Sequence, residues 1–534
     1  MSQNQSYDMV VLGAGHNGLV CAGYLARAGY RVKVLERRGV VGGAAVTEEI
    51  IPGYRNSTLS WVVGLLPAKI IHELELERFG LKIINRRSSG LQIFPDGRHL
   101  LLGLDKTANL REYAKFSETD AVRMPAYERQ LSEIADLVRE LTFETPPRAA
   151  GGIGAMVDMG KLLYRLKRSH NNHYVKLASL LGKSAGDMLD EWFESEEIKG
   201  HLAFTAIVGN FVSPYFPGSS VVLLHSVYGE TNGVKGAFGH PYGGMGAITR
   251  AMADSARSKG VEIEVNAAVM RVIVENGFAR GAVLQDGTEI RARAVVSSLN
   301  PKLLLLDLID KNDLPADVVE RMKHWRCRGG VIRLNLALSE LPRFAQMPNL
   351  DANGYTSMFK ISPSMSYLDQ AYDDAKTGNW SRKPAVMWSF PSTLDDSLAP
   401  PGHHVASVFA QHFHPKLSGA RSWDDCKHEA AESVITLIDQ QCPNFRNAIV
   451  GMKILSPLDL EREYGLLGGD IFHGQMHLDQ SYVLRPLAGY ADYRAPIRNL
   501  FMCGSGTHPG GSVTGMPGHN AAREILNDVR RRRL

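Results

Sequence analysis

The chain has 534 residues, of which 44% are hydrophobic and 22% are charged. These fractions are near the averages of globular proteins and exclude disorder, collagen and coiled coil as descriptions of the whole chain. The 60 basic and 56 acidic residues leave a net charge of +4, which is too even to indicate nucleic-acid binding. At about 150 residues per domain, this length corresponds to three or four domain-sized units.

The cysteines and the apolar runs bear on the compartment. Five cysteines without a CxxC pair do not suit a disulfide scaffold, and a reducing compartment fits them best. The first residues show no basic region followed by an apolar run, so no signal peptide is predicted. No apolar run reaches the length of a spanning helix, about 18 residues. We therefore expect a cytoplasmic protein, with peripheral membrane contact as an option.

The beginning of the chain has the pattern of a strand, a helix and a second strand. Met9 to Leu12 is a short apolar run suited to a buried parallel strand. Asn17 to Ala28 predicts a helix, and Gly29 is the glycine expected just after a helix end. Arg31 to Leu35 predicts the second strand.

Between the first strand and the helix, residues 13–18 read GAGHNG, the GxGxxG pattern, and Glu36 follows the second strand. In a dinucleotide site Gly13 allows the tight turn, Gly15 lets the pyrophosphate approach the backbone, and Gly18 lets the helix pack on the strand. The helix N-terminus presents amides to the phosphates, and Glu36 suits a ribose hydroxyl. The alternative is a glycine turn with a structural role alone.

The middle of the chain is mixed. Residues 91–104 predict β-structure, and residues 145–154 predict a loop or linker. Between these two segments, one helix face is predicted from Leu131, Ile134, Ala135 and Val138.

The stretch from His201 to Gly229 contains no Lys, Arg, Asp or Glu. It is interpreted either as ordinary core or as the wall of an apolar substrate channel. A helix is predicted from Gly246 to Lys259, and a β-meander follows over residues 261–297 with turns at two Asx-Gly pairs. A further amphipathic helix is predicted near residues 427–440.

The C-terminal region repeats the strand, glycine turn and helix of the N-terminal region. Leu500 to Cys503 predicts a strand, and residues 503–522 are rich in glycine and open a helix. No charged side chain occurs from Asn499 to Ala522. FAD needs contacts at two separate places, one for its ADP half and one for its isoalloxazine ring, whereas NAD would need only the first turn. The two glycine-rich turns therefore favour FAD.

The chain resembles the phytoene desaturase branch of the flavin amine oxidase-like superfamily, and within it the pyridine nucleotide-disulfide oxidoreductase domain-containing protein 2 group. The stretches that carry the resemblance are GAGHNGLVCAGYLARAGYRVKVLERR, GGAAVTEEI, SPYFPGSSVVLLH, GGMGAITRAMA, GGDIFHGQMHLDQ and CGSGTHPGGSVTG. Many relatives have an arginine directly after the glycine pair that corresponds to Gly42 and Gly43, where this chain has Ala44.

The resemblance implies a set of FAD-binding residues. Met516 and Pro517 would place a helix N-terminus at the flavin, where its dipole would stabilise negative charge. The implied residues are Gly13, Gly15, Gly18, Glu36, Gly43, Val269, Gly504, Ser505, Gly506, Thr507, Met516 and Pro517.

The implied fold is α/β. We predict a discontinuous Rossmann-like FAD-binding domain with a β-meander, formed by residues 1–110, 236–300 and 480–534. An inserted α+β domain, formed by residues 111–235 and 301–479, would bind the substrate or act as a lid.

Catalytic residues are less well indicated, because the flavin supplies most of the chemistry in this family. His473 follows a double glycine in a matching segment, His508 precedes Pro509, and His225 lies near the end of the uncharged stretch. Each is weighed against an ordinary role as a satisfied structural histidine. No metal site is predicted.

The predicted function is hydride transfer between an apolar, isoprenoid or polyene-like molecule and flavin N5. The alternatives are a redox-neutral polyene isomerase, an amine oxidase, and a flavoprotein without turnover that acts as an interaction partner. The expected partner is an apolar small molecule and not a nucleic acid, with a homo-oligomer as an option. The tail DVRRRRL is interpreted as a solvated helix end or as a weak contact for anionic lipid.

Overall fold

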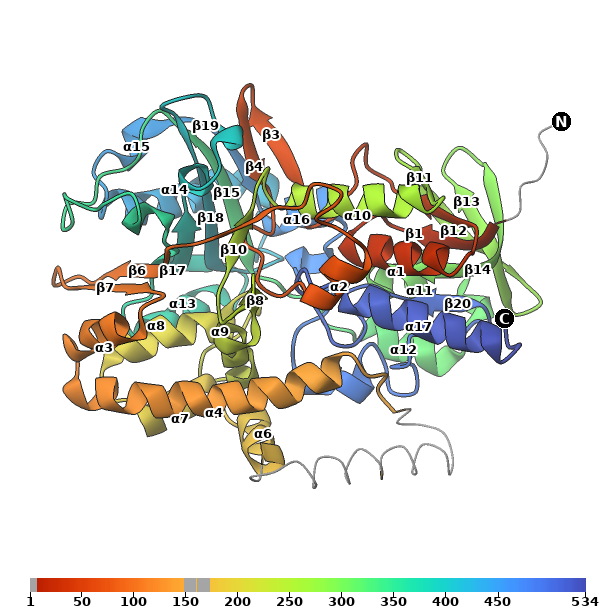
Figure 1. The fold of residues 1–534 in the computed structure, drawn as a ribbon, viewed down its shortest axis with the longest axis horizontal. Coiled ribbons are helices and arrows are strands. Elements are labelled where there is room, and N and C mark those ends of the chain that lie inside the picture. Colours follow the sequence, from red (N-terminus) through yellow and green to blue (C-terminus); the bar gives the residue numbers. More distant parts are fainter. Residues whose placement is uncertain (1–6, 148–159, 161–172) are drawn as a thin grey trace.

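The computed structural model describes residues 7–147, residue 160 and residues 173–534. Two seven-stranded sheets dominate it. They lie at opposite ends of the long axis, and the C-terminus lies near the first sheet (Figure 1). Among the described residues, no helix combines the length and apolarity needed to cross a membrane.

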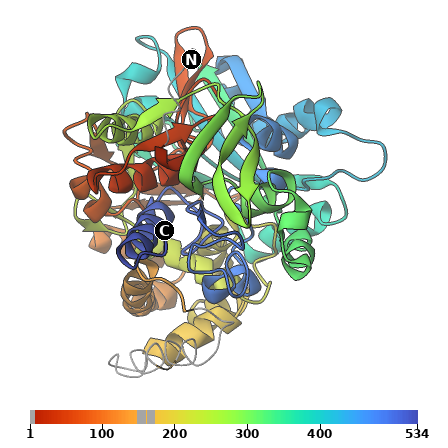
Figure 2. The ribbon, with the colours of Figure 1, turned by 90° about the vertical axis from the view of Figure 1, so that its right-hand side faces the viewer.

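The first sheet has the strand order β11-β2-β1-β14-β13-β12, with β20 also paired to β14. The strands β11, β2, β1, β14 and β20 run parallel, whereas β12, β13 and β14 form the antiparallel meander that stands in front in Figure 2. Their bounds are β1 (Tyr7–Leu12), β2 (Val32–Leu35), β11 (Glu262–Glu264), β12 (Val269–Glu275), β13 (Phe278–Leu284), β14 (Glu289–Ser297) and β20 (Leu500–Met502).

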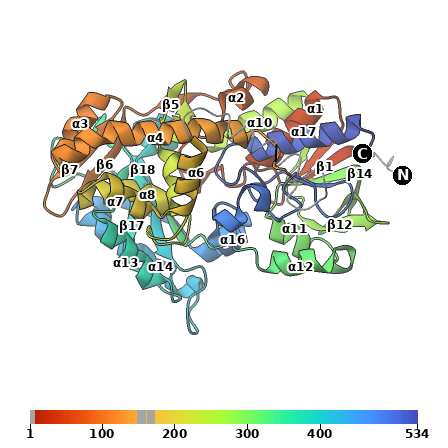
Figure 3. The same cartoon turned by 90° about the horizontal axis from the view of Figure 1, so that it is seen from below.

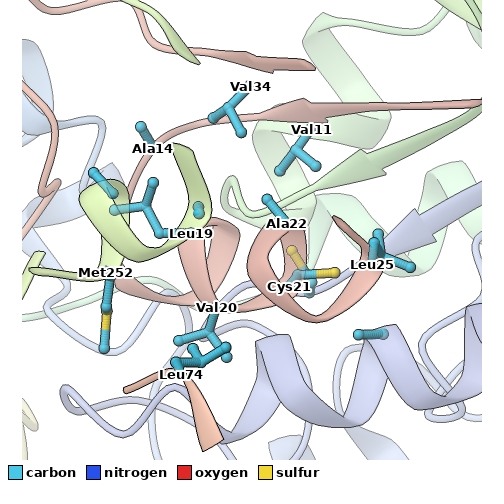
Figure 4. Packing of buried hydrophobic residues seen from close by; sticks show 14 of the residues in the cluster. Val11, Ala14, Leu19, Val20, Cys21, Ala22, Leu25, Val34, Leu74 and Met252 are labelled. Carbon is cyan, nitrogen blue, oxygen red and sulfur yellow. The ribbon is translucent and has the colours of Figure 1, made fainter. Parts of the chain in front are cut away.

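On one face of this sheet pack α1 (His16–Arg27), α10 (Gly246–Ser258) and α17 (Met516–Arg530). On its other face pack α11 (Pro301–Asp307) and α12 (Ala316–Lys323). Leu19 and Ala22 of α1 pack in one buried cluster with Val11 of β1 and Val34 of β2 (Figure 4). This packing confirms four predictions: the first βαβ unit, the helix from Gly246 to Lys259, the C-terminal strand and the C-terminal helix. In each of them the apolar residues face a partner that buries them.

The second sheet has the order β19-β15-β18-β17-β16-β6-β7. Its hairpin β6–β7 lies within residues 1–110, which were predicted to belong to the cofactor domain, yet β6 pairs with β16. The predicted domain boundaries did not include this pairing, because the sequence of a short strand does not indicate which distant strand it pairs with. The bounds are β6 (Ser88–Ile93), β7 (His99–Gly103), β15 (Val331–Leu338), β16 (Phe359–Ile361), β17 (Trp380–Ser389), β18 (His404–Phe413) and β19 (Ile449–Leu455).

Alternate residues of the second sheet face opposite layers. Leu334 and Leu336 pack with α14 (Trp423–Asp439), whereas Val331 packs with α4 (Glu118–Thr142) and α8 (Glu196–Ile207). The helix predicted from Leu131 and its neighbours is α4. Its C-terminal end reaches the C-terminal region, where Thr142 O accepts a hydrogen bond from Asn520 (Figure 3).

The remaining described elements include packed helices, such as α13 (Met365–Ala375) on β17, as well as short connections. Most of the predicted linker 145–154 lies outside the described residues. The other described α-helices are α2 (Ala68–Glu73), α3 (Lys106–Ala114), α6 (His173–Gly182), α7 (Ala185–Trp192), α9 (His225–Tyr228), α13 (Met365–Ala375), α15 (Phe445–Ala448) and α16 (Pro457–Tyr464). The remaining strands are β3 (Thr47–Ile51), β4 (Tyr54–Ser57), β5 (Ile83–Asn85), β8 (Glu230–Thr231), β9 (Val234–Lys235) and β10 (Gly239–Pro241).

Candidate functional site

The turn between β1 and α1 has three glycines with three different environments. Gly13 has a φ of +91°, which favours glycine. A Cβ on Gly18 would lie 2.2 Å from Gly13 O, so the helix packs against the turn as the motif predicts. A Cβ on Gly15 would meet no heavy atom within 4 Å. The space in front of Gly15 is therefore open to a ligand.

A second glycine turn lies against the first. Gly42 N donates to Ala14 O over 2.9 Å, and a Cβ on Gly43, at φ +56°, would lie 3.2 Å from Gly15 Cα. The chain then returns, and Ser60 N donates to Ala44 O over 3.1 Å. The segment after β4 therefore runs beside the two glycine turns.

Glu36 lies at the end of β2, as predicted. Its carboxylate accepts hydrogen bonds from Ala14 N at 2.8 Å and Arg38 N at 3.0 Å. Its carbonyl accepts from Ala267 N at 2.8 Å, which brings the start of the strand that contains Val269 close to it. This is the end of the site predicted for the adenosine half, and the ribose and adenine contacts of Glu36 and Val269 stay predictions.

The C-terminal loop joins this site from the other end of the chain. Cys503 N donates to Ser297 O over 2.8 Å, and a Cβ on Gly504 would lie 2.4 Å from Ser298 O. Ser505 Oγ accepts a hydrogen bond from Asn17 Nδ2 at 3.1 Å, and Thr507 Oγ1 donates to Gly504 O over 2.8 Å. A Cβ on Gly506 would lie 2.2 Å from Pro301 Cδ. Backbone here approaches its neighbours closely, which only glycine allows.

Two helix N-termini converge at this loop. A Cβ on Gly518, in the first turn of α17 after Met516 and Pro517, would lie 2.1 Å from Asn17 O in the first turn of α1. The buried atoms His16 Nδ1 and Asn17 Oδ1 have no hydrogen-bond partner among the described residues. Together with the open space at Gly15, these free polar atoms and the two positive helix ends fit a large ligand with a pyrophosphate.

The fold and this site define a dinucleotide-binding flavoprotein. Residues 18–415 match the family described as flavin containing amine oxidoreductase, so the chain belongs to this family and its cofactor is FAD.

Particular relatives agree with this assignment. The pyridine nucleotide-disulfide oxidoreductase domain-containing protein 2 of Rattus norvegicus is 39% identical over 98% of this chain and 94% of its own length. One of the subunits of limonene dehydrogenase from Castellaniella defragrans is 25% identical, covering 99% of this chain and 96% of its own length. A solved variant of putrescine oxidase superposes with a TM-score of 0.62 at 16% identity, covering 99% of both chains, which supports the fold alone.

The backbone of His473 lies beside the C-terminal loop between β20 and α17, called the cofactor loop from here on. Its carbonyl lies 3.3 Å from the Cβ that Gly506 lacks. Its own φ is +59°, and its Nδ1 has no partner among the described residues. Burial, with smaller contributions from nearby His16 and Arg485, lowers the pKa of His473 to about 4, so its ring is neutral near pH 7. A neutral imidazole can accept or donate one proton.

The other two predicted histidines have different surroundings. His508 Nε2 lies 3.0 Å from Leu141 O, and its ring packs edge-on against Tyr482, so His508 ties the cofactor loop to the end of α4. His225 begins α9, which packs on α4. Burial lowers the pKa of His225 and of His508 to about 4 each. A role in catalysis stays a prediction for all three histidines.

Sequence reasoning missed Arg485, which is fully buried. Its guanidinium donates to Ser505 O at 2.8 and 3.2 Å, to Phe472 O at 2.7 Å, to Gly474 O at 3.1 Å and to Gln480 O at 3.0 Å. It therefore fixes the segment that carries His473 against the cofactor loop. Its place before a proline in a loop gives no indication of this role.

The uncharged stretch from His201 to Gly229 divides into three parts. Phe204 is fully buried among α4, α8 and the second sheet, which agrees with the core interpretation. Tyr215 and Phe216 are 43% and 37% exposed. The loop around Gly209 approaches the cofactor loop through Phe472: a Cβ on Gly209 would lie 2.7 Å from Phe472 Cε2, and a Cβ on Gly511 would lie 2.1 Å from Phe472 Cδ1.

Proposed function

We propose that the protein is an oxidoreductase that transfers hydride between an apolar, isoprenoid or polyene-like molecule and FAD. The observation that carries the proposal is the ring of Phe472, which is packed between Gly209 of the uncharged stretch and Gly511 of the cofactor loop. This arrangement gives the cofactor loop an apolar neighbour on the side of the second sheet. The relative from limonene dehydrogenase supports the same substrate class, since limonene is an apolar isoprenoid.

FAD supplies the acceptor atom for the hydride when it is bound. The glycine turns and helix N-termini orient it through backbone groups. Phe472 and its apolar neighbours exclude water from the reacting C–H bond and hold the substrate chain. In this proposal the neutral imidazole of His473, whose backbone carbonyl lies beside Gly506, takes the proton that a desaturation releases or orients a polar group of the substrate.

A substrate panel tests the proposal. Purified holoenzyme is mixed without oxygen with a monoterpene, with a polyene in detergent or with a primary amine, and flavin absorbance is followed. We expect bleaching with an isoprenoid or polyene. Bleaching by the amine alone would contradict the proposal in favour of an amine oxidase. A polyene that rearranges only after chemical reduction of the flavin, with no net bleaching, would contradict it in favour of an isomerase.

The role of His473 is tested with His473→Ala. We expect the rate of flavin reduction to fall at least about tenfold while FAD stays bound, because general acid–base help contributes about 10² to 10⁴. His324→Ala is the matched control, since the side chain of His324 is 79% exposed and, among the described residues, is hydrogen-bonded to Glu320 alone. An unchanged rate in His473→Ala would make His473 a structural residue.

A further inference from the structure

One row of paired residues across the second sheet contains two cations. Arg333 of β15 pairs with Phe409 of β18, and Phe409 pairs with Met387 of β17. Met387 pairs in turn with Lys360 of β16. Paired residues point to one face, and Phe409 and Met387 place this face in the apolar cluster of α4 and α8. Since neighbouring strands are about 4.8 Å apart, the Cα atoms of the two cations stand about 14 Å apart with apolar side chains between them.

The two cations differ in how far the protein itself holds them. Arg333 is 1% exposed, donates to Ser407 Oγ over 2.7 Å and stacks over Trp61 at 4.0 Å from the ring centroid. Lys360 is partly exposed, and its Nζ donates one hydrogen bond, to His201 O of α8 over 3.2 Å. An ammonium group carries three donors, so two N–H groups of Lys360 have no acceptor among the described residues.

The surroundings of Lys360 are neutral. Among the residues that the structure describes, no carboxylate bonds to Lys360 or acts on its charge. Its Nζ lies 5.8 Å from the centre of the Phe204 ring, and its strand pairs with Gln92 of β6. The ring of His201 lies 3.0 Å from Gln92 Oε1, and burial lowers the pKa of His201 well below its usual value, so this ring is neutral. Burial also lowers the pKa of Lys360 to about 8, so most of the amine is still charged at pH 7. A charge with free donors in an apolar setting favours an anionic acceptor.

Helix α8 leads from Lys360 toward the cofactor loop. His201, whose carbonyl accepts the hydrogen bond from Lys360 of β16, lies near the middle of α8. From residue 201 to its end at residue 207 the helix advances about 9 Å. Just beyond that end, Gly209 N donates to Gln411 Oε1 of β18 over 2.6 Å, so α8 crosses the sheet from β16 to β18. Gly209 also packs against Phe472, whose ring lies against the cofactor loop. A chain-like molecule along α8 would therefore have one end at Lys360 and the other at Phe472.

We propose that Lys360 binds the anionic head group of the substrate, and that this substrate is an apolar isoprenoid or polyene chain that ends in a carboxylate. The inference rests on the proposed function and narrows its substrate class. The two free N–H groups of Lys360 donate to the carboxylate oxygens, and such charge-assisted hydrogen bonds are stronger than neutral ones. Met387 and Phe409 lie beside the chain. The bound head group then fixes how far the chain extends along α8, and so which of its C–H bonds reaches the cofactor loop.

Farnesoate and farnesol test the proposal, because they share one isoprenoid chain and differ in the charge of the head group. Each is titrated into FAD-loaded protein in a calorimeter, below the concentration at which it aggregates. We expect wild type to bind farnesoate at least about tenfold more tightly than farnesol. Lys360→Met should raise the Kd of farnesoate about tenfold or more and leave farnesol nearly unchanged, whereas Lys360→Arg, which keeps the charge, should stay within about threefold of wild type.

Lys453→Met is the matched control. Lys453 is also a lysine on a strand of the second sheet, but its Nζ lies 2.8 Å from a carboxylate oxygen of Glu463. We expect its affinity for farnesoate to stay within about threefold of wild type. The pH gives a second readout: the affinity of wild type for farnesoate should fall as the pH rises through about 8, because Lys360 loses its proton, and the affinity of Lys360→Arg should not.

Three results would overturn the proposal. The first is a wild type that does not bind farnesoate or binds farnesol as tightly, and this result decides even if Lys360→Met does not fold. The second is an equal weakening of farnesoate and farnesol in Lys360→Met, which would mark a packing effect instead of a charge effect. The third is an unchanged preference for farnesoate in Lys360→Met with a lost preference in Arg333→Gln, which would place the anion at the other end of the row.

The proposed function can fail separately from this site. If farnesoate binds through Lys360 but no isoprenoid or polyene bleaches the flavin, the anion site stands and the proposed hydride transfer is contradicted. If an isoprenoid bleaches the flavin at the same rate in wild type and in Lys360→Met, and wild type does not prefer the acid, the proposed function stands and the role of Lys360 is contradicted.

Discussion

The cofactor side of this protein, around the first sheet, and the side of the second sheet are built in different ways. Around FAD the chain uses backbone and glycines, and Gly13, Gly15 and Gly18 each leave space or allow close approach. On the second sheet it uses large buried side chains, among them Arg333 and His412, whose nitrogens are partly or wholly without partners among the described residues. Recognition by backbone requires particular small residues at fixed spacing, whereas recognition by side chains depends on neighbours that are distant in the sequence.

The largest effect is expected for Gly18→Val. A Cβ there would lie 2.2 Å from Gly13 O and 3.0 Å from Ser298 Oγ, so the turn or the helix must move. We expect a loss of about 4 kcal/mol or more in the free energy of unfolding, seen as insoluble protein or as a strongly lowered denaturation midpoint. A soluble variant with wild-type stability would contradict this prediction, because it would mean that the turn can move to accommodate the side chain at little cost in free energy.

Gly15→Val differs from Gly18→Val, because a Cβ on Gly15 would meet no heavy atom of the described residues within 4 Å. Gly15 has φ −71° and ψ 168°, which any residue can adopt. We expect folded, colourless protein whose affinity for FAD falls by about a thousandfold, since the side chain would occupy the space of the pyrophosphate. Circular dichroism measures the fold and the ratio of flavin to protein absorbance measures occupancy. A yellow variant would contradict the placement of FAD at this turn.

The same contrast explains what could be predicted from the sequence. The GxGxxG turn, the C-terminal loop and their strands follow from local patterns, and their elements are confirmed within about one to three residues at most ends. The pairing of β6 with β16 and the packing of Phe472 between two glycines could not be predicted, because each depends on segments far apart in the chain. Arg333 stands in the apolar run VIRLNLAL, where one arginine gives no sign of burial.

The third prediction concerns Arg485, which joins the two sides. Arg485→Met would leave carbonyls of Ser505 and Phe472 without their donor and Asp470 without its nearby cation. We expect a loss of about 3 to 5 kcal/mol in the free energy of unfolding and a weaker hold on FAD. Denaturant unfolding and flavin release measure the two effects.

Arg485→Lys is the control for Arg485→Met, because it keeps the charge but not the fork of donors. It is expected to recover only part of the stability. If Arg485→Lys had the full stability of wild type, the charge alone would be important. If Arg485→Met had wild-type stability and FAD affinity, Arg485 would not be needed to position the segment of His473 against the cofactor loop.

The smallest predicted effect concerns His412 at the end of β18. His412 is fully buried, its two ring nitrogens have no partner among the described residues, and its ring packs edge-on against Phe211 and Tyr372 at 5.5 and 5.6 Å. Burial lowers the pKa of His412 to about 3. The unfolded chain therefore binds a proton at this histidine below about pH 6.5, whereas the folded chain does not. The stability that the neutral ring provides is present above about pH 6.5 and is lost as the pH falls toward about 3.

His412→Phe removes this titration and keeps an aromatic ring against the same neighbours. At a single pH, the gain from removing unpaired nitrogens competes with the larger volume of phenylalanine, so the difference between two pH values is the sharper readout. Moving from about pH 7 to about pH 5 should cost the variant about 2 kcal/mol less than wild type, because one pKa unit corresponds to about 1.4 kcal/mol and the other histidines titrate equally in both proteins. Urea unfolding at the two pH values measures it. An equal loss in both proteins would mean that His412 is already hydrogen-bonded or hydrated in solution, and the second sheet would then hold fewer uncompensated groups than its geometry indicates.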